Sequence, residues 1–155
     1  SAGDPGWHRE AYHTPGHDPG HLCFLEESTG VLIAGDMVAN PGRIVVAHAF
    51  GGNMSDFMGN LERLAQLPAK IIIPSHGKVS GDPPQALRKT LGHRQWREDK
   101  IRAALDAGHT TIEALLNVAY DDAPEAAREL AKHALEAHLA KIGITIDSDG
   151  ERVKI

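Results

Sequence analysis

The chain has little of what marks several classes of protein. Its single cysteine, Cys23, excludes an intramolecular disulfide, which fits a reducing compartment such as the cytoplasm. Its longest apolar runs, such as "GVLIAGDMVA", are too short and too interrupted to span a bilayer. The opening residues, "SAGDPGW", lack the basic and apolar regions of a signal peptide. We therefore expect a cytoplasmic protein with no membrane partner.

An excess of basic charge is also absent. The net charge is −5 over 155 residues, with 5 Lys+Arg against 9 Asp+Glu in residues 1–82 and 11 against 12 in residues 83–155. A protein that binds duplex DNA through its phosphates needs a basic surface, so this balance argues against duplex DNA as a partner. What the chain does have is ten histidines, and histidine is a common metal ligand.

Residues 1–82 have the pattern of strands and loops with one helix. "HLCFLEE" and "VLIAGD", separated by a turn sequence, predict a β-hairpin, and "EAYHT" predicts a strand before it. "NMSDFMGNLERLAQLP" predicts a helix capped by Asn53 or Ser55 and stopped by Pro68. "KIIIPSHG" is typical of a strand buried on both faces.

From Pro83 onward the pattern is mostly helical. Residues 83–106 predict one long charged helix, and "TTIEALLNVAY" predicts a second with a capping box from Thr110 to Glu113. "DDAPEAARELAKHALEAHLAKIG" predicts a third, with Asp122 as its cap and Gly143 at its exit. "ITIDSDGERVKI" predicts a hairpin. Three helices closed by a hairpin are the outline of a winged helix, which we expect over residues 107–155.

Three polar side chains end predicted strands: His17 in "TPGHDPGH", Asp36 in "AGDMV" and His76 in "PSHG". Functional sites gather at such strand ends in layered α/β folds. Two imidazoles and a carboxylate suit zinc, iron or manganese. These three motifs, in this order, resemble the third, fourth and fifth metal motifs of the metallo-β-lactamase-fold hydrolases.

The resemblance implies an α+β chain in three parts: the C-terminal half of an αβ/βα sandwich (1–82), a linking helix (83–106) and the winged-helix domain (107–155). The tail, with "LGHRQWREDKIRAAL" and "AHLAKIG", resembles the domain appended to lactamase-like proteins that include single-strand endoribonucleases. "TPGH-x-x-GH" also resembles the glyoxalase-II-like thioesterases. The implied substrates are therefore a small ester or thioester, or single-stranded RNA.

The resemblance also implies the roles of the site residues. His17 would ligate one divalent metal, His76 a second, and Asp36, the catalytic residue, would bridge them. Zinc is the first choice, with iron or manganese as alternatives. The metals would activate water for hydrolysis of an ester, thioester or phosphodiester.

The first motif of that family, H-x-H-x-D-H, does not occur in this sequence. Each metal would then have two protein ligands, fewer than zinc sites need. We expect the C-terminal part of a larger hydrolase, inactive alone, whose partner is the missing N-terminal half. An open half-sandwich would expose apolar strand faces and form homo-oligomers. The alternative is a non-catalytic winged-helix interaction module with a degenerate lactamase half.

Other residues carry weaker expectations. His21 is either an outer partner that orients a metal ligand or a histidine bonded to backbone. His48 either shapes a substrate pocket or is an ordinary loop residue. His93, Arg97 and Lys100 share one helical face, which would bind a phosphate or carboxylate or simply face solvent. Cys23 is expected in the core and not as a nucleophile.

Overall fold

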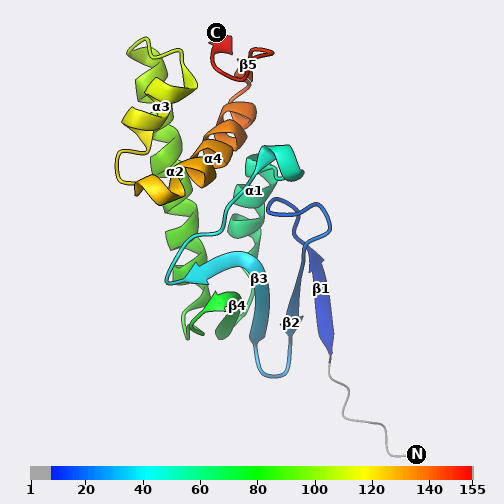
Figure 1. The fold of residues 1–155 in the computed structure, drawn as a ribbon. Coiled ribbons are helices and arrows are strands. Elements are labelled where there is room, and N and C mark those ends of the chain that lie inside the picture. Colours follow the sequence, from blue (N-terminus) through cyan, green and yellow to red (C-terminus); the bar gives the residue numbers. More distant parts are fainter. Residues whose placement is uncertain (1–7, 155) are drawn as a thin grey trace, which may run out of the picture.

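The computed structural model describes residues 8–154 as a mixed sheet with helices on one side, followed by a helical segment and a small hairpin (Figure 1). The sheet has the order β1-β2-β3-β4, with β3 and β4 parallel and the other pairs antiparallel. Its strands are β1 (Arg9–His13), β2 (Leu22–Glu26), β3 (Val31–Asn40) and β4 (Ile71–Gly77). The helices are α1 (Met54–Leu64), α2 (Pro83–Asp106), α3 (Ile112–Ala119) and α4 (Arg128–Lys141).

The predicted hairpin is confirmed. Strands β2 and β3 pair with Phe24 opposite Ile33 and Glu26 opposite Val31. The Glu26 carboxylate accepts hydrogen bonds from Ser28 and Thr29 in the turn, and these bonds lower the pKa of Glu26 to about 2. The turn is therefore closed by side chains of its own sequence.

The helix predicted after residue 53 is also confirmed. The Asn53 side chain caps α1 by accepting a hydrogen bond from the Asp56 amide at 3.0 Å, and the helix ends at Leu64, ahead of Pro68. Residues three and four apart lie on the same side of a helix, so the apolar residues of α1 form one face. This face packs on one face of the sheet. Phe57 and Leu61 of α1 are fully buried against the sheet core, which includes Cys23, Leu25, Leu32 and Ile72.

The opposite face of the sheet is apolar and open among the described residues. The prediction that β4 is buried on both faces is wrong: Ile72 is 1% exposed, but Ile71 is 38% and Ile73 36% exposed. Because paired residues share a face, the register defines an open apolar face that is exposed or half-buried. Its apolar residues are Leu22, Phe24, Val31, Ile33, Ile71 and Ile73, beside the buried Glu26, which pairs with Val31.

Helix α2 has the predicted bounds and joins two apolar cores. Leu87 and Leu91, in its first half, belong to the core under the sheet, whereas Ile101 and Ala104 pack with α3 and α4. The second core also contains Leu115, Leu116, Leu135, Leu139 and Val153. None of the described helices combines the length and apolar character needed to cross a membrane.

The helices and hairpin predicted after residue 107 are present, with two corrections. Thr111, not Thr110, caps α3: its hydroxyl accepts a hydrogen bond from the Ala114 amide at 3.1 Å, while the Thr110 carbonyl accepts from the Val153 amide. Asp122 does not cap a helix: α4 begins only at Arg128, after a 3-10 turn, Glu125–Ala127. The hairpin consists of β5 (Thr145–Ile146) and β6 (Val153–Lys154), and the exit glycine, Gly143, has the expected left-handed φ of 79°.

Asp122 instead anchors α2 through Arg97. The Arg97 guanidinium is 3% exposed, donates to both Asp122 oxygens at 2.7 and 3.0 Å, and also donates to the Ala119 carbonyl. The guanidinium carbon lies 4.2 Å from the centre of the Tyr120 ring. These bonds lower the pKa of Asp122 to about 2. Arg97 therefore ties α2 to the segment after α3.

We expect Asp122→Ala to lower the free energy of unfolding by about 2–3 kcal/mol. Removing one partner of a buried ion pair costs about 3–5 kcal/mol, and the Asp122 side chain, 35% exposed, places this site below that range. Urea unfolding followed by circular dichroism measures the loss. The neighbouring Asp121→Ala is the control, because Asp121 is 60% exposed in its pair with Lys100. Equal effects of the two substitutions would show that Arg97 does not need Asp122.

Candidate metal centre

The loop between β1 and β2 carries His17 and rests on the start of α1. The Asn53 amide donates to the Gly16 carbonyl at 2.8 Å, and the Asn60 side chain donates to the Pro15 carbonyl at 2.7 Å. Gly16 has a φ of 143°, and a side chain there would overlap the backbone of Phe57. The Pro-Gly sequence before His17 therefore allows a close approach that fixes the loop.

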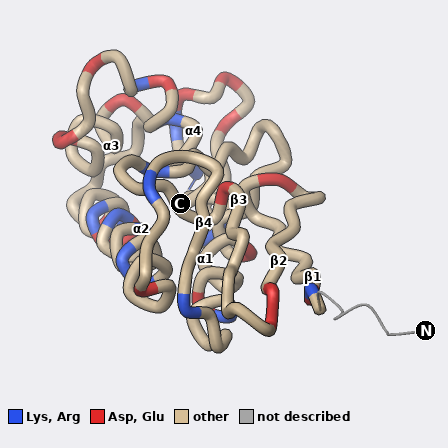
Figure 2. The backbone as a smooth tube through the Cα atoms, turned by 90° about the horizontal axis from the view of Figure 1, so that it is seen from below, with Lys and Arg blue, Asp and Glu red and all other residues tan. Residues whose placement is uncertain are grey.

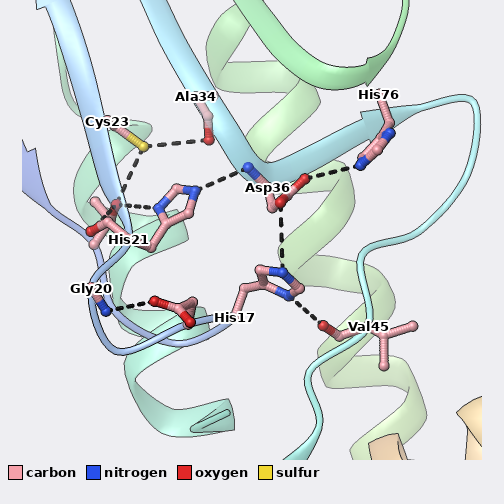
Figure 3. A network of polar contacts seen from close by, with 10 residues as sticks. His17, Gly20, His21, Cys23, Ala34, Asp36, Val45 and His76 are labelled. Carbon is pink, nitrogen blue, oxygen red and sulfur yellow. Dashed lines mark hydrogen bonds and ion pairs between the residues drawn. The ribbon is translucent and has the colours of Figure 1, made fainter. Parts of the chain in front are cut away.

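The position of the His17 ring fixes its tautomer. Its Nδ1 lies 2.7 Å from the carbonyl oxygen of Val45, and a carbonyl can only accept, so Nδ1 carries the hydrogen. The Nε2 lone pair then points toward Asp36, whose Oδ2 is 3.6 Å away (Figure 3). An imidazole held in this way by a backbone carbonyl is ready to ligate a metal through Nε2.

Asp36 lies between two imidazoles. Its Oδ1 is 3.3 Å from Nε2 of His76, and its Oδ2 faces His17, so the two carboxylate oxygens face different rings (Figure 3). Parallel pairing of β3 with β4 brings these groups together, since Ala39 is the register partner of His76. Within residues 8–154, the buried Oδ1 atom has no hydrogen-bond partner. Its contact with His76 Nε2 at 3.3 Å leaves this oxygen with capacity to accept a water or a cation.

This donor set fits divalent metal ions in part. With metal–ligand distances of about 2.0–2.1 Å, neighbouring ligand atoms in a tetrahedral site lie about 3.3–3.4 Å apart, close to the two N–O separations here. The described residues, however, contain no group of three or more His, Cys, Asp or Glu side chains that could hold a metal. Each of two ions would thus have two ligands, one imidazole and a share of Asp36.

His21 contacts the backbone of Asp36. Its Nε2 accepts a hydrogen bond from the Asp36 amide at 3.0 Å, so its hydrogen is on Nδ1, which donates to Thr14 Oγ1 at 2.8 Å. Burial lowers the pKa of His21, which keeps the ring neutral. The structure therefore has His21 bonded to backbone, as one of the two expectations held. The other, that it orients a metal ligand, stays a prediction.

Two supporting groups were not predicted from the sequence, Thr14 and the Val45 carbonyl. A third, Gly35, is the glycine of the "AGD" motif. Thr14 is fully buried and, as the residue before "PGH", belongs to a motif that already pointed to this loop. Gly35 has a φ of 53°, and "AGD" offered that signal. The sequence contains no signal for the Val45 carbonyl, because every residue type has a backbone carbonyl.

Among the described residues, no hydrogen bond or ion pair joins the other candidates on loops and on α2 to Asp36, whereas Cys23 accepts a hydrogen bond from Thr14. His48 is exposed in a 3-10 turn (His48–Phe50). The expected anion-binding face on α2 is divided: Lys100 pairs with Asp121 and Arg97 with Asp122. His93 is half-buried beside Trp96, with ring centres 5.5 Å apart. Cys23 is fully buried, as expected, and burial raises the pKa of its thiol to about 11.

Comparison with known proteins gives a family match for the first part of the chain. Residues 1–76, just under half of the 155 residues, match the family described as the metallo-beta-lactamase superfamily. This superfamily includes metal-dependent hydrolases.

The curated relatives are longer than the aligned part of this chain. Lactamase-like protein aptB of Emericella nidulans is 34% identical over 62% of this chain and 29% of its own length. Lactamase-like protein adaB of Aspergillus niger is 30% identical over 74% and 39%, and the Drosophila melanogaster beta-lactamase-like protein 2 homolog is 28% identical over 84% and 44%. The chain thus spans less than half the length of each of these relatives.

Two solved structures have the same fold as this chain and are also longer than it. The metallo-beta-lactamase family protein TTHA1429 from Thermus thermophilus superposes with a TM-score of 0.76 and 25% identity, over 94% of this chain and 48% of that one. A beta-lactamase domain protein from Burkholderia ambifaria superposes with a TM-score of 0.74 and 22% identity, which shows the fold. Both matches extend over α2 and the segment after it, because they cover 94% of the chain.

We expect Gly35→Ala to destabilise the protein by about 2–3 kcal/mol and to displace His21. The new Cβ would lie 2.5 Å from His21 Nε2, and the left-handed backbone adds strain of its own. Urea unfolding measures the loss, and amide NMR shifts of Asp36 report the displaced ring. In the control Gly92→Ala, inside α2 with nothing within 4 Å, stability should rise by about 0.5–1 kcal/mol. A rise in stability in both variants would contradict the close packing of Gly35 and His21.

Proposed function

We propose that this chain supplies half of the ligands of a dinuclear metal hydrolase, through His17, Asp36 and His76. The observation that carries the proposal is the Asp36 carboxylate, whose two oxygens face the Nε2 atoms of two different imidazoles at 3.6 and 3.3 Å. When bound, two divalent cations would activate water for attack on a carbonyl or phosphoryl centre. Zinc is our first choice, with iron or manganese as alternatives.

The chain's own residues hold this geometry. The Val45 carbonyl fixes the His17 tautomer, and His21 holds the Asp36 backbone through a bond that Thr14 supports from the other side of the ring. Such outer partners contribute to metal affinity, and losing one costs about 10–100-fold. Asp36 is the catalytic residue of the proposal because it would touch both cations. The His76 side chain is 72% exposed and would be held in place only by the metal ion that it binds.

The remaining ligands would come from the N-terminal half of the same fold. Two ligands per ion are fewer than the three plus water of a catalytic zinc site, so the chain alone would bind metal weakly and be inactive. TTHA1429 has a further 52% of its chain beyond the matched part, which is enough for that half. It would cover the open apolar face and complete an αβ/βα sandwich, with residues 107–155 as a winged-helix domain.

The substrate stays open within this proposal. An ester, a thioester and the phosphodiester of single-stranded RNA all react by attack of activated water. A non-catalytic interaction module is the alternative, and it differs in needing no metal. An H-x-H-x-D-H motif encoded upstream in the same gene would favour the hydrolase, and a gene without one would favour the module.

We expect zinc to bind this chain weakly and Asp36→Asn to remove that binding. Asp36 is shared by both proposed ions, so its loss leaves one imidazole for each. Calorimetric titration with zinc at neutral pH measures the affinity. Asp56→Asn is the control, because Asp56 lies exposed in the first turn of α1. Tight binding of nearly one zinc per chain would show that the ligand count is wrong. Equal zinc binding by Asp36→Asn and the unchanged chain would show that Asp36 is not a metal ligand.

In a protein that carries the upstream half, the same substitution has a second readout. Asp36→Asn should lower kcat by at least about 100-fold, the upper end of what losing an outer partner costs. Unchanged activity would refute the bridging role.

We expect the chain alone to self-associate through its open sheet face. Sheet packing buries such faces, and an exposed apolar patch of this kind binds another surface. Light scattering after size-exclusion chromatography should show a concentration-dependent mass that Ile33→Lys shifts toward the monomer. Val118→Lys is the control, because Val118 is similarly exposed, at 38%, on α3. A monomer at all concentrations would argue against an unsatisfied face.

A further inference from the structure

A cavity of about 820 Å³ lies on the helix side of the sheet, away from the open face. Its walls are the end of β3 with the loop that follows, the end of β4 and the first half of α2. Ile72, which points toward the helices and is 1% exposed, lines it, whereas Ile71 and Ile73 on the open face do not. His17, Asp36 and His76 are not among its lining residues either. Covering the open face would therefore leave this cavity accessible.

The polar lining of the cavity is basic. None of the described residues that line it is Asp or Glu, although the chain as a whole has a net charge of −5. Figure 2 shows lysine and arginine positions along α2, which forms one wall. The basic lining residues are Arg43, Lys78, Lys89, His93 and Arg94. Two carboxylates lie nearby, but Asp82 caps α2 and Asp122 is held by Arg97, with Arg43 3.7 Å away.

Arg94 is the least expected of these groups. It is 5% exposed, donates to the Ile44 carbonyl and lies over the Phe57 ring at 5.4 Å. No carboxylate pairs with it in residues 8–154, and its buried Nε has no hydrogen-bond partner there. A buried guanidinium without an anion is costly, because the lost hydration is not replaced. Arg97, three residues later, is buried to a similar extent but pairs with the Asp122 carboxylate, as buried guanidinium groups usually do.

His93 adds a second unused polar group. Its Nε2 is buried and has no partner among the described residues. Burial, and then the nearby cations Arg43, Arg94 and Arg97, lower the pKa of His93 to about 4, so the ring is neutral at pH 7. A neutral imidazole can still donate one hydrogen bond to an anion.

We propose that this cavity binds a small organic phosphate monoester. The phosphate would lie between Arg94, His93 and the rim lysines, where a dianion meets several cations and two unused buried nitrogens. The organic part would lie on the apolar wall formed by Val38, Ile44, Ile72 and Pro74. The volume is that of a small-molecule site, larger than an inorganic ion needs. This binding needs neither the metals nor the proposed hydrolysis.

The test uses phenyl phosphate as a probe, with phenol and inorganic phosphate as comparisons. EDTA in every sample removes metal from the Asp36 site. Calorimetry should show phenyl phosphate binding at least about 10-fold more tightly than either comparison, and binding should weaken as salt is added. Amide NMR shifts should change around Ile44 and Thr90, both in the cavity wall. Phenol binding as tightly as phenyl phosphate, no binding of the probe, or shifts confined to His17 and Asp36 would overturn the proposal.

Two rim variants keep the test separate from folding. Lys78 and Lys89 are exposed, so Lys89→Glu, alone or with Lys78→Glu, should leave the fold intact and weaken phenyl phosphate binding at least about 10-fold. Lys70→Glu makes the same charge change at an exposed position outside the cavity and should bind like the unchanged chain. Equal binding by Lys89→Glu and Lys70→Glu would show that the cavity does not hold the phosphate.

Discussion

Parallel pairing of β3 with β4 is the constraint on which the rest of the structure depends. It requires a crossover, and α1 within that crossover covers one face of the sheet. The same pairing places His76 beside the strand that carries Asp36, and the loop before β2 then brings His17 to the other carboxylate oxygen. Because the crossover covers one face only, the apolar side chains of the other face stay open.

The sequence predicted best what local chemistry decides. The hairpin, the Asn53 cap and the bounds of α2 depend on residues a few positions apart, and the structure has them. It failed where a distant group competes. Asp122 has the properties of a helix cap, but a buried guanidinium 25 residues away in the chain binds it instead. The prediction that both faces of β4 are buried was wrong, because an apolar sequence indicates that the strand favours burial on both faces but does not say which segment would cover the second face.

The candidate site divides in the same way. His17, Asp36 and His76 could be predicted as a group because histidine and aspartate at strand ends, in motifs of known order, are typical of metal sites. Thr14 could not, since its hydroxyl holds His21, which itself accepts a hydrogen bond from a backbone amide. Such supporting contacts depend on distances across the fold, and neither residue type nor spacing states them.

Arg94 and Arg97 show how far the structure goes beyond the helical pattern. The sequence placed Arg97 on a face with His93 and Lys100 and left open whether that face binds an anion or faces solvent. In the structure Arg97 and Lys100 pair with aspartates of the same chain. Arg94, one position past His93, lines the cavity, and its partners within residues 8–154 are the Ile44 carbonyl and the Phe57 ring. Both guanidiniums are buried to nearly the same extent. Burial therefore removes a similar amount of hydration from each guanidinium. Arg97 regains it from a carboxylate and Arg94 does not, so the difference in partners, and not the positive charge itself, marks Arg94 as the position on α2 that can still bind an anion.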